Sequence, residues 1–156
     1  MLAGLGNVRR LRYQRTGDLS DLQQAILAVQ EARDGMPVDD QHYATVLSNL
    51  SALPYYLYER TGSESTHNEA VAAGRAALGA GHSLSTLSNL GSSLLQRFVR
   101  TRDSRVLEEA ADLLARAVAG TPEEDPDLPV RLNNLAEAQG CRFFQLDESI
   151  RLGRRA

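Results

Sequence analysis

Lysine and tryptophan are absent from this chain, and cysteine occurs once, at Cys141. Without lysine the chain has no P-loop lysine, no Schiff-base lysine and no lysine general base. A single cysteine excludes an internal disulfide and a zinc site built from several cysteines. One cysteine also fits a reducing cytosol, where disulfides are rare.

Strong net charge and long apolar runs are absent as well. The 156 residues carry a formal net charge of -3, which is too mild to indicate nucleic acid or an anionic membrane as a partner. No apolar run approaches the ~18 residues of a membrane span. Residues 1–6 lack the charged start and sustained apolar core of a signal peptide. We therefore expect a cytoplasmic protein with no nucleic-acid or membrane partner.

What the chain does contain is an internal repeat. The tetrad Leu-x-Asn-Leu occurs at residues 47–50, 87–90 and 132–135, with a degenerate copy at 2–5, so the first leucines are 45, 40 and 45 residues apart. An aromatic residue, expected in the core, keeps the same spacing at Tyr13, Tyr58, Phe98 and Phe143. A fixed period in this range is typical of stacked helical repeats.

Each repeat has the pattern of two helices, A and B. In the second unit, the apolar residues Val46, Leu50, Leu53 and Leu57 recur at the three-four spacing of an amphipathic helix. Ser or Asp residues precede the B helices, and we expect N-caps at Ser20, at Ser65 or Thr66, and at Asp103. The expected A helices span about 2–15, 41–60, 83–100 and 128–144, and the B helices about 19–34, 65–79, 104–119 and 147–155.

The last unit is shortened. With a spacing of 45 residues, the counterpart of Ala110 in the last B helix would be residue 155. The matching pattern instead begins at Ser149, six residues early. The Arg-Thr-Gly-Asp turn of the first unit has no counterpart between Phe144 and Leu146. Either the last two helices fuse, or a tight and strained turn joins them.

These patterns predict an all-α fold, an α-solenoid of antiparallel helix pairs with about three and a half repeats. We expect one repeat domain over 1–156, with units near 1–40, 41–82, 83–126 and 127–156. The chain opens and ends inside helices and lacks polar capping helices, which indicates a fragment of a longer array. The alternative is a short array that associates with itself through its uncapped ends.

The Leu-x2-Leu-Gly pattern at residues 87–91, followed by small residues in the B helix, resembles tetratricopeptide repeats. The long period with Asn-Leu in the A helix is similar to kinesin light chain repeats. It resembles more closely the long bacterial arrays, many of which precede a caspase-like CHAT domain. The resemblance implies a right-handed solenoid with a concave groove lined by the A helices. In that groove, Asn before the second leucine bonds the backbone of a bound peptide.

The resemblance and helical spacing together assign the groove positions. An amide side chain offers both a donor and an acceptor, so it can pair with an extended peptide in either direction. The alternative is that the Asn side chains bond the neighbouring helix and stiffen the stack, and that the two tyrosines pack around Pro54. The candidate groove residues are Asn49, Asn89, Asn134, Ser48, Ser88, Asn133, Ser92, Tyr55, Tyr56 and Gln96.

Catalytic patterns are missing. His42, His67 and His82 fall in different units without metal-ligand spacing, and no phosphate-binding loop or nucleophile elbow is present. We therefore expect no enzymatic activity, no cofactor and no metal, and a scaffold that binds a protein or peptide. Two alternatives remain: a regulatory or substrate-recognition segment of a larger CHAT protein, and a self-assembly module.

Overall fold

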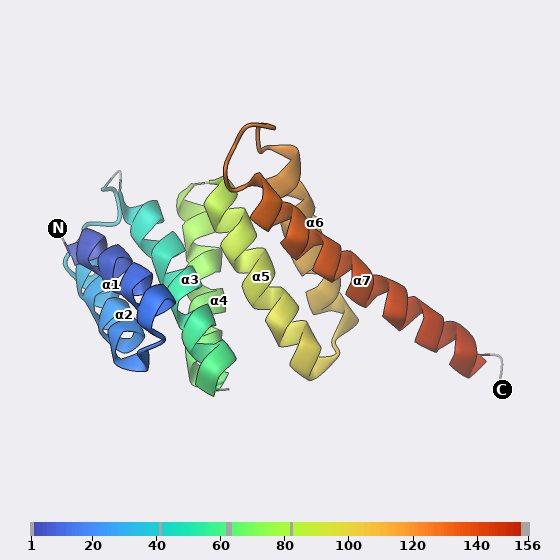
Figure 1. Cartoon of the computed structure of the whole chain (residues 1–156). Coiled ribbons are helices and arrows are strands. Elements are labelled where there is room, and N and C mark those ends of the chain that lie inside the picture. Colours follow the sequence, from blue (N-terminus) through green and yellow to red (C-terminus); the bar gives the residue numbers. More distant parts are fainter. Residues whose placement is uncertain (1, 41, 62–63, 82, 154–156) are drawn as a thin grey trace.

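The computed structural model describes residues 2–40, 42–61, 64–81 and 83–153. Every regular element in these ranges is an α-helix, so the predicted all-α class is confirmed (Figure 1). The helices are α1 (Leu2–Thr16), α2 (Leu19–Asp34), α3 (Tyr43–Thr61), α4 (Glu64–Ala80), α5 (Leu84–Thr101), α6 (Ser104–Ala119) and α7 (Leu128–Gly153). Among these described helices, none is both long enough and apolar enough to cross a membrane.

Helices that follow one another in the chain pack side by side. The closest packing joins α1 to α2, α3 to α4, and α5 to α6, and the three pairs follow one another across the molecule (Figure 1). Each odd-numbered helix after α1 also contacts the odd-numbered helix before it. Two clusters of buried apolar side chains fill the spaces between the helices, one centred on α2 and α3 and the other on α5 and α6.

Aspartate side chains cap α2 and α6, the second helices of the first and third pairs. The carboxylate of Asp18 accepts a hydrogen bond from the Ser20 N–H at 2.9 Å, and Asp103 accepts one from the Arg105 N–H at 3.0 Å. The prediction for Asp103 is confirmed, whereas Ser20 as the cap of α2 is wrong because Asp18 already satisfies the free N–H groups of the first turn. The predicted start of α4 is also late, because that helix already includes Glu64.

α1 and α5, the first helices of the first and third pairs, each end at a residue with a left-handed backbone conformation. Gly17 has φ of +70° and donates its N–H to the Tyr13 carbonyl at 2.7 Å. Arg102 takes the same role after α5, with φ of +54° and an N–H bond of 2.8 Å to the Phe98 carbonyl. An L-residue in this conformation is disfavoured, and the Arg102 guanidinium lies 5.7 Å from the Phe98 ring centroid, which offsets part of the cost.

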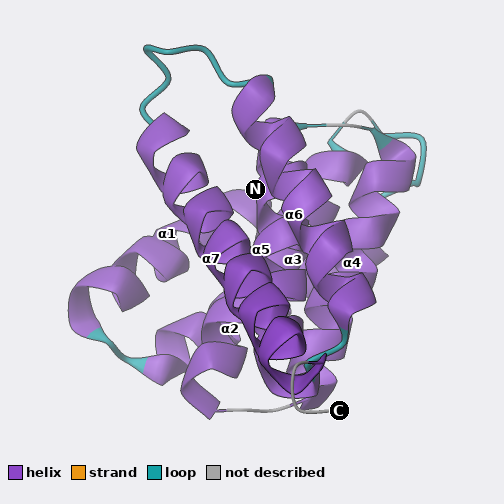
Figure 2. Cartoon of the chain, turned by 90° about the vertical axis from the view of Figure 1, so that its right-hand side faces the viewer, coloured by secondary structure: helices purple, strands orange, loops and turns teal. Residues whose placement is uncertain are grey.

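The shortened last unit forms one continuous helix. α7 runs from Leu128 to Gly153 without a break, so a separate helix near 147–155 is wrong and the fused alternative is the observed one. Nothing stops the helix at Phe144–Leu146, because that segment has neither a glycine in the left-handed conformation nor a proline. Beyond the hydrogen bonds of Arg142 and Gln145 to α6, the helix extends away from the rest of the molecule (Figure 1). In Figure 2 α7 lies in front of the other helices.

The recurring aromatic residue occupies three different environments. Phe98 is buried at 1 % exposure between α5 and α6, and Tyr13 is half-buried against the α2–α3 cluster. Phe143 is 68 % exposed, so its predicted place in the core is wrong. The reason is the fused helix, since within the described part of the chain no second helix folds back over Phe143. The side chain of Tyr58 lies outside the described residues.

Candidate functional site

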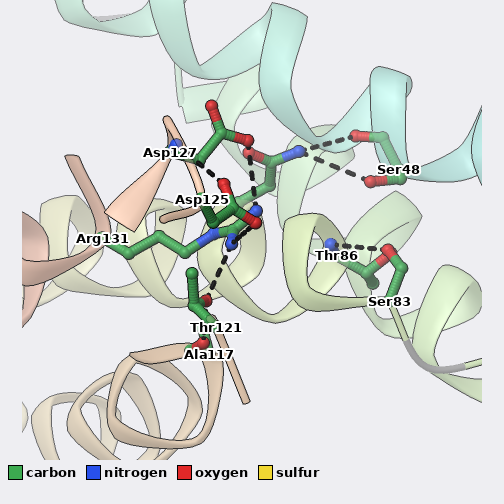
Figure 3. Close-up of polar contacts among 9 residues, drawn as sticks. Ser48, Ser83, Thr86, Ala117, Thr121, Asp125, Asp127 and Arg131 are labelled. Atoms are coloured by element: carbon green, nitrogen blue, oxygen red, sulfur yellow. Dashed lines mark hydrogen bonds and ion pairs between the residues drawn. The ribbon is translucent and has the colours of Figure 1, made fainter. Parts of the chain in front are cut away.

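The predicted groove positions lie along α3, α5 and α7, where hydrogen bonds join successive odd-numbered helices. The Nδ2 of Asn89 on α5 donates to both the carbonyl oxygen and the Oγ of Ser48 on α3, each at 3.4 Å. In Figure 3 these bonds reach Ser48 as two dashed lines. One unit further on, Asn134 Nδ2 of α7 donates to Ser92 Oγ of α5 at 3.0 Å. The structure thus brings four of the predicted residues together in pairs, which we call the amide strip.

The candidate residues differ in how much of them a ligand could reach. Ser48 and Ser88 are buried, at 6 % and 8 % exposure, so they contribute mainly to packing between helices. Asn133 is exposed, and the side chains of Tyr55 and Tyr56 lie outside the described residues. The half-buried members, which can contact both a neighbouring helix and a ligand, are Asn49, Asn89, Ser92, Gln96 and Asn134.

A small hollow of about 150 Å³ lies between α5 and the start of α7. At ~30 Å³ per water molecule this volume holds about five waters, or one side chain of a ligand. Its walls combine amide, hydroxyl, carboxylate and guanidinium groups with one apolar side chain. The lining residues are Ser85, Ser88, Asn89, Asp127, Val130 and Arg131.

Arg131 is a buried cation at the base of this hollow, at 5 % exposure. Its Nη1 donates to Thr121 Oγ1 at 2.7 Å and lies 3.4 Å from the carboxylate of Asp125, while its Nη2 lies 3.2 Å from that of Asp127 (Figure 3). The Thr121 hydroxyl in turn donates to the Ala117 carbonyl at 2.6 Å. Arg131 therefore fixes the loop after α6 onto the first turn of α7.

Sequence reasoning missed this cluster, because a Gly- and Pro-containing acidic loop indicates an exposed turn. One signal was available: Asp127 and Arg131 are four residues apart, the spacing at which oppositely charged side chains meet on a helix.

The even-numbered helices are joined by long polar side chains. Gln30 of α2 donates to Glu69 of α4, and Arg75 of α4 forms an ion pair of 2.9 Å with Glu109 of α6. Gln30 and Arg75 are 45 residues apart, and Glu69 and Glu109 are 40 apart, so both contacts follow the repeat. These contacts are partly or fully exposed, and exposed ion pairs contribute little to stability.

His67 and Cys141 both have pKa values shifted by burial. Burial lowers the pKa of His67, and the nearby cations Arg97 and Arg100 lower it further. Burial raises the pKa of the Cys141 thiol, and Glu137 adds to that effect, so the thiol stays protonated near neutral pH. Among the described residues, no three His, Cys, Asp or Glu side chains gather closely enough to hold a metal ion.

A scan of the chain against protein-family models found no match, and searches of curated proteins and of solved structures found none either.

Proposed function

We propose that this chain is a non-catalytic scaffold whose odd-numbered helices bind an extended protein or peptide segment. In this proposal the helix pairs form a right-handed solenoid of tetratricopeptide-like units. The packing supports a concave odd-numbered face. Within the described residues, the backbones of α3 and α5, and those of α5 and α7, approach each other closely. The backbones of α2, α4 and α6 do not, and side chains bridge these helices. A stack of helix pairs curves toward the side on which its helices lie closer together.

The observation that carries the proposal is the amide strip. Each Asn side chain has two N–H donors and an oxygen with two acceptor sites. The bonds of Asn89 to Ser48 and of Asn134 to Ser92 occupy donors alone, and hold each amide in one orientation. An oriented amide that keeps its acceptor can pair with a peptide N–H without losing further side-chain freedom. Stiffening the stack and binding a ligand are therefore compatible roles for the same residue.

The hollow between α5 and α7 supplies a second contact beside the strip. It presents the Asp127 carboxylate and the Ser85 hydroxyl, and Val130, which is 62 % exposed, adds an apolar surface. A ligand side chain with an apolar stem and a donor at its end would match these groups. Because the Arg131 guanidinium lines the same hollow and already pairs with Asp127, we expect bound segments to carry an uncharged donor such as Gln at one fixed position.

A random-peptide library selected on the full chain tests the proposal, with selected peptides measured by fluorescence anisotropy. The variant replaces Asn49, Asn89 and Asn134 with Ala together. At about 1 kcal/mol for each lost hydrogen bond, the dissociation constant should rise roughly 100-fold. Helicity, followed by circular dichroism, should be retained.

The matched control replaces polar residues of the even-numbered helices, Gln23, Asn68 and Asp112, with Ala; all three are exposed. The control should bind selected peptides as the wild type does. Equal losses in both variants would place the peptide elsewhere, and unfolding of the Asn variant alone would assign the amides to stability.

A further inference from the structure

The outer face of α7 carries an uncovered apolar stripe. Phe143, Leu146 and Ile150 are 68 %, 60 % and 45 % exposed and follow one another at three-four spacing. They lie on the side of the helix opposite Ala138 and Cys141, which pack against the α5–α6 cluster. With the neighbouring turns included, the stripe consists of Ala136, Gln139, Phe143, Leu146, Ile150 and Gly153.

The repeat shows what this stripe corresponds to. Phe143 lies 45 residues after Phe98, whereas Leu146 and Ile150 each lie 39 residues after Leu107 and Ala111. Those three counterparts are 1 %, 0 % and 3 % exposed in the α5–α6 interface. One continuous helix therefore carries both halves of a helix-pair interface that is buried in the preceding unit.

The chain cannot close this interface on itself while α7 is straight. In the preceding unit, Gly91 of α5 faces Leu114 of α6, so closely that a Cβ on Gly91 would lie 2.7 Å from Leu114 Cγ. The corresponding positions in α7 are Ala136 and Gly153, which are 17 residues apart on one helix. At ~1.5 Å per residue that separation is about 25 Å, so these two positions can meet only between two molecules.

The stripe is also symmetric. Its successive spacings of three, four, three, four and three residues read the same in both directions, about a midpoint between Phe144 and Gln145. A second α7 laid antiparallel across that midpoint places Phe143 opposite Leu146, Gln139 opposite Ile150, and Ala136 opposite Gly153. Each contact then occurs twice, as a two-fold axis requires.

We propose that two copies of this chain form a two-fold dimer through antiparallel packing of their α7 helices, each supplying the second helix that the other lacks. The flanking residues are compatible with this arrangement. Asp147 would lie beside Gly140 of the second copy, so it meets no like charge there. Arg142 keeps its ion pair of 3.0 Å with Glu108 of its own chain.

A hollow beside the stripe can receive side chains of the second helix. A hollow of about 700 Å³ lies where α7 diverges from α6, and Gln139, Phe143 and Leu146 of the stripe line it together with Ser104 and Glu108 of α6. In Figure 1 this part of α7 has no helix beside it on its outer side.

The test is multi-angle light scattering after size exclusion of the full chain over a concentration series. The wild type should approach twice its mass of 17.0 kDa as concentration rises. Leu146→Glu should be monomeric throughout, with unchanged helicity, because Leu146 is exposed within one molecule. Val130→Glu is the matched control: it changes an exposed apolar residue of the same helix outside the stripe and should dimerise like the wild type.

A second variant tests the swapped arrangement. Copying residues 100–105, which span the turn between α5 and α6, between Phe144 and Gln145 restores the six missing residues in register. The second half of α7 can then fold back on its own first half, and the dimer should be lost with helicity retained. A wild type that stays monomeric at every concentration overturns the proposal. So does a dimer that survives Leu146→Glu or the insertion, because it must use another surface.

Discussion

Truncating the same aromatic residue in two successive units should have very different costs. Phe98 is 1 % exposed and packs within the α5–α6 cluster, whereas Phe143, its counterpart 45 residues on, is 68 % exposed. Phe98→Ala removes a buried ring and leaves a cavity, at a cost of about 3–5 kcal/mol. It also removes the ring beneath the Arg102 guanidinium, worth about 0.5–1 kcal/mol. Phe143→Ala removes a side chain already largely in water and should cost at most ~0.5 kcal/mol.

Urea unfolding followed by circular dichroism measures both costs as shifts of the midpoint. A domain of this size has a total stability of about 5–15 kcal/mol, so Phe98→Ala should remove a large share of it. Phe98→Leu keeps most of the volume and should cost less than Phe98→Ala. The comparison must be made at concentrations where the wild type is monomeric, because a second copy would cover Phe143.

Comparable losses in the two alanine variants of the monomer would refute this reasoning. They would mean that α7 folds back on itself in solution and buries Phe143. A loss below ~1 kcal/mol for Phe98→Ala would instead refute the packing of α5 against α6. A fused α7 agrees only with a large loss of unfolding free energy for Phe98→Ala and a negligible loss for Phe143→Ala.

Three further substitutions test individual contacts. The pKa of His67 is lowered by burial and then by Arg97 and Arg100, so the folded chain binds fewer protons than the unfolded chain. The free energy of unfolding should be constant above the unfolded pKa of about 6.5 and should fall as pH drops below it. Urea titrations at pH 7.5 and 5.5 should show a smaller decline for His67→Gln. An unchanged decline would count against His67 as its cause. Gly91→Ala places a Cβ 2.7 Å from Leu114 Cγ. Overpacking costs about 1–3 kcal/mol, which should exceed the ~1 kcal/mol gain in helix propensity, so the variant should be less stable. A raised thermal midpoint would disprove this expectation. Arg131→Met removes a buried cation and leaves its hydrogen-bond acceptors unpaired, which should cost about 1–3 kcal/mol of stability. Proteolysis of residues 120–127 should become faster. Unchanged cleavage would show that Arg131 does not hold that loop.

The fold class followed from the sequence because the repeat and the helical spacing both predict helices, although Leu132 of the last tetrad is 47 % exposed. The tetrad leucines Leu47, Leu50, Leu87 and Leu90 are buried, as one apolar face per helix requires. Helix ends were predicted less well, because a cap depends on which of several nearby Ser and Asp side chains reaches the free N–H groups. At α2 the N-cap is Asp18, two residues before Ser20.

The candidate site was predicted only in outline. The spacing placed Asn89 and Asn134 on one side of the helices, and both lie where a neighbouring odd-numbered helix is within reach. Which partner each amide takes depends on the offset between stacked helices, which no single repeat encodes. Asn89 bonds Ser48, 41 residues earlier, whereas Asn134 bonds Ser92, 42 residues earlier. The buried Arg131 was missed for a related reason, since its partners come from a loop whose path depends on the arginine itself.

The missing six residues in the last unit change the energetics of one interface without changing its contacts. When a turn joins two helices, each meets the other at an effective concentration in the millimolar range, and the turn itself adds little closure cost. When the turn is lost, the same surfaces meet only at the concentration of the protein. The interface between Phe143 and Leu146 should therefore depend on concentration, whereas that between Phe98 and Leu107 should not. Dilution should thus release the contacts of the last unit and leave those of the preceding unit intact.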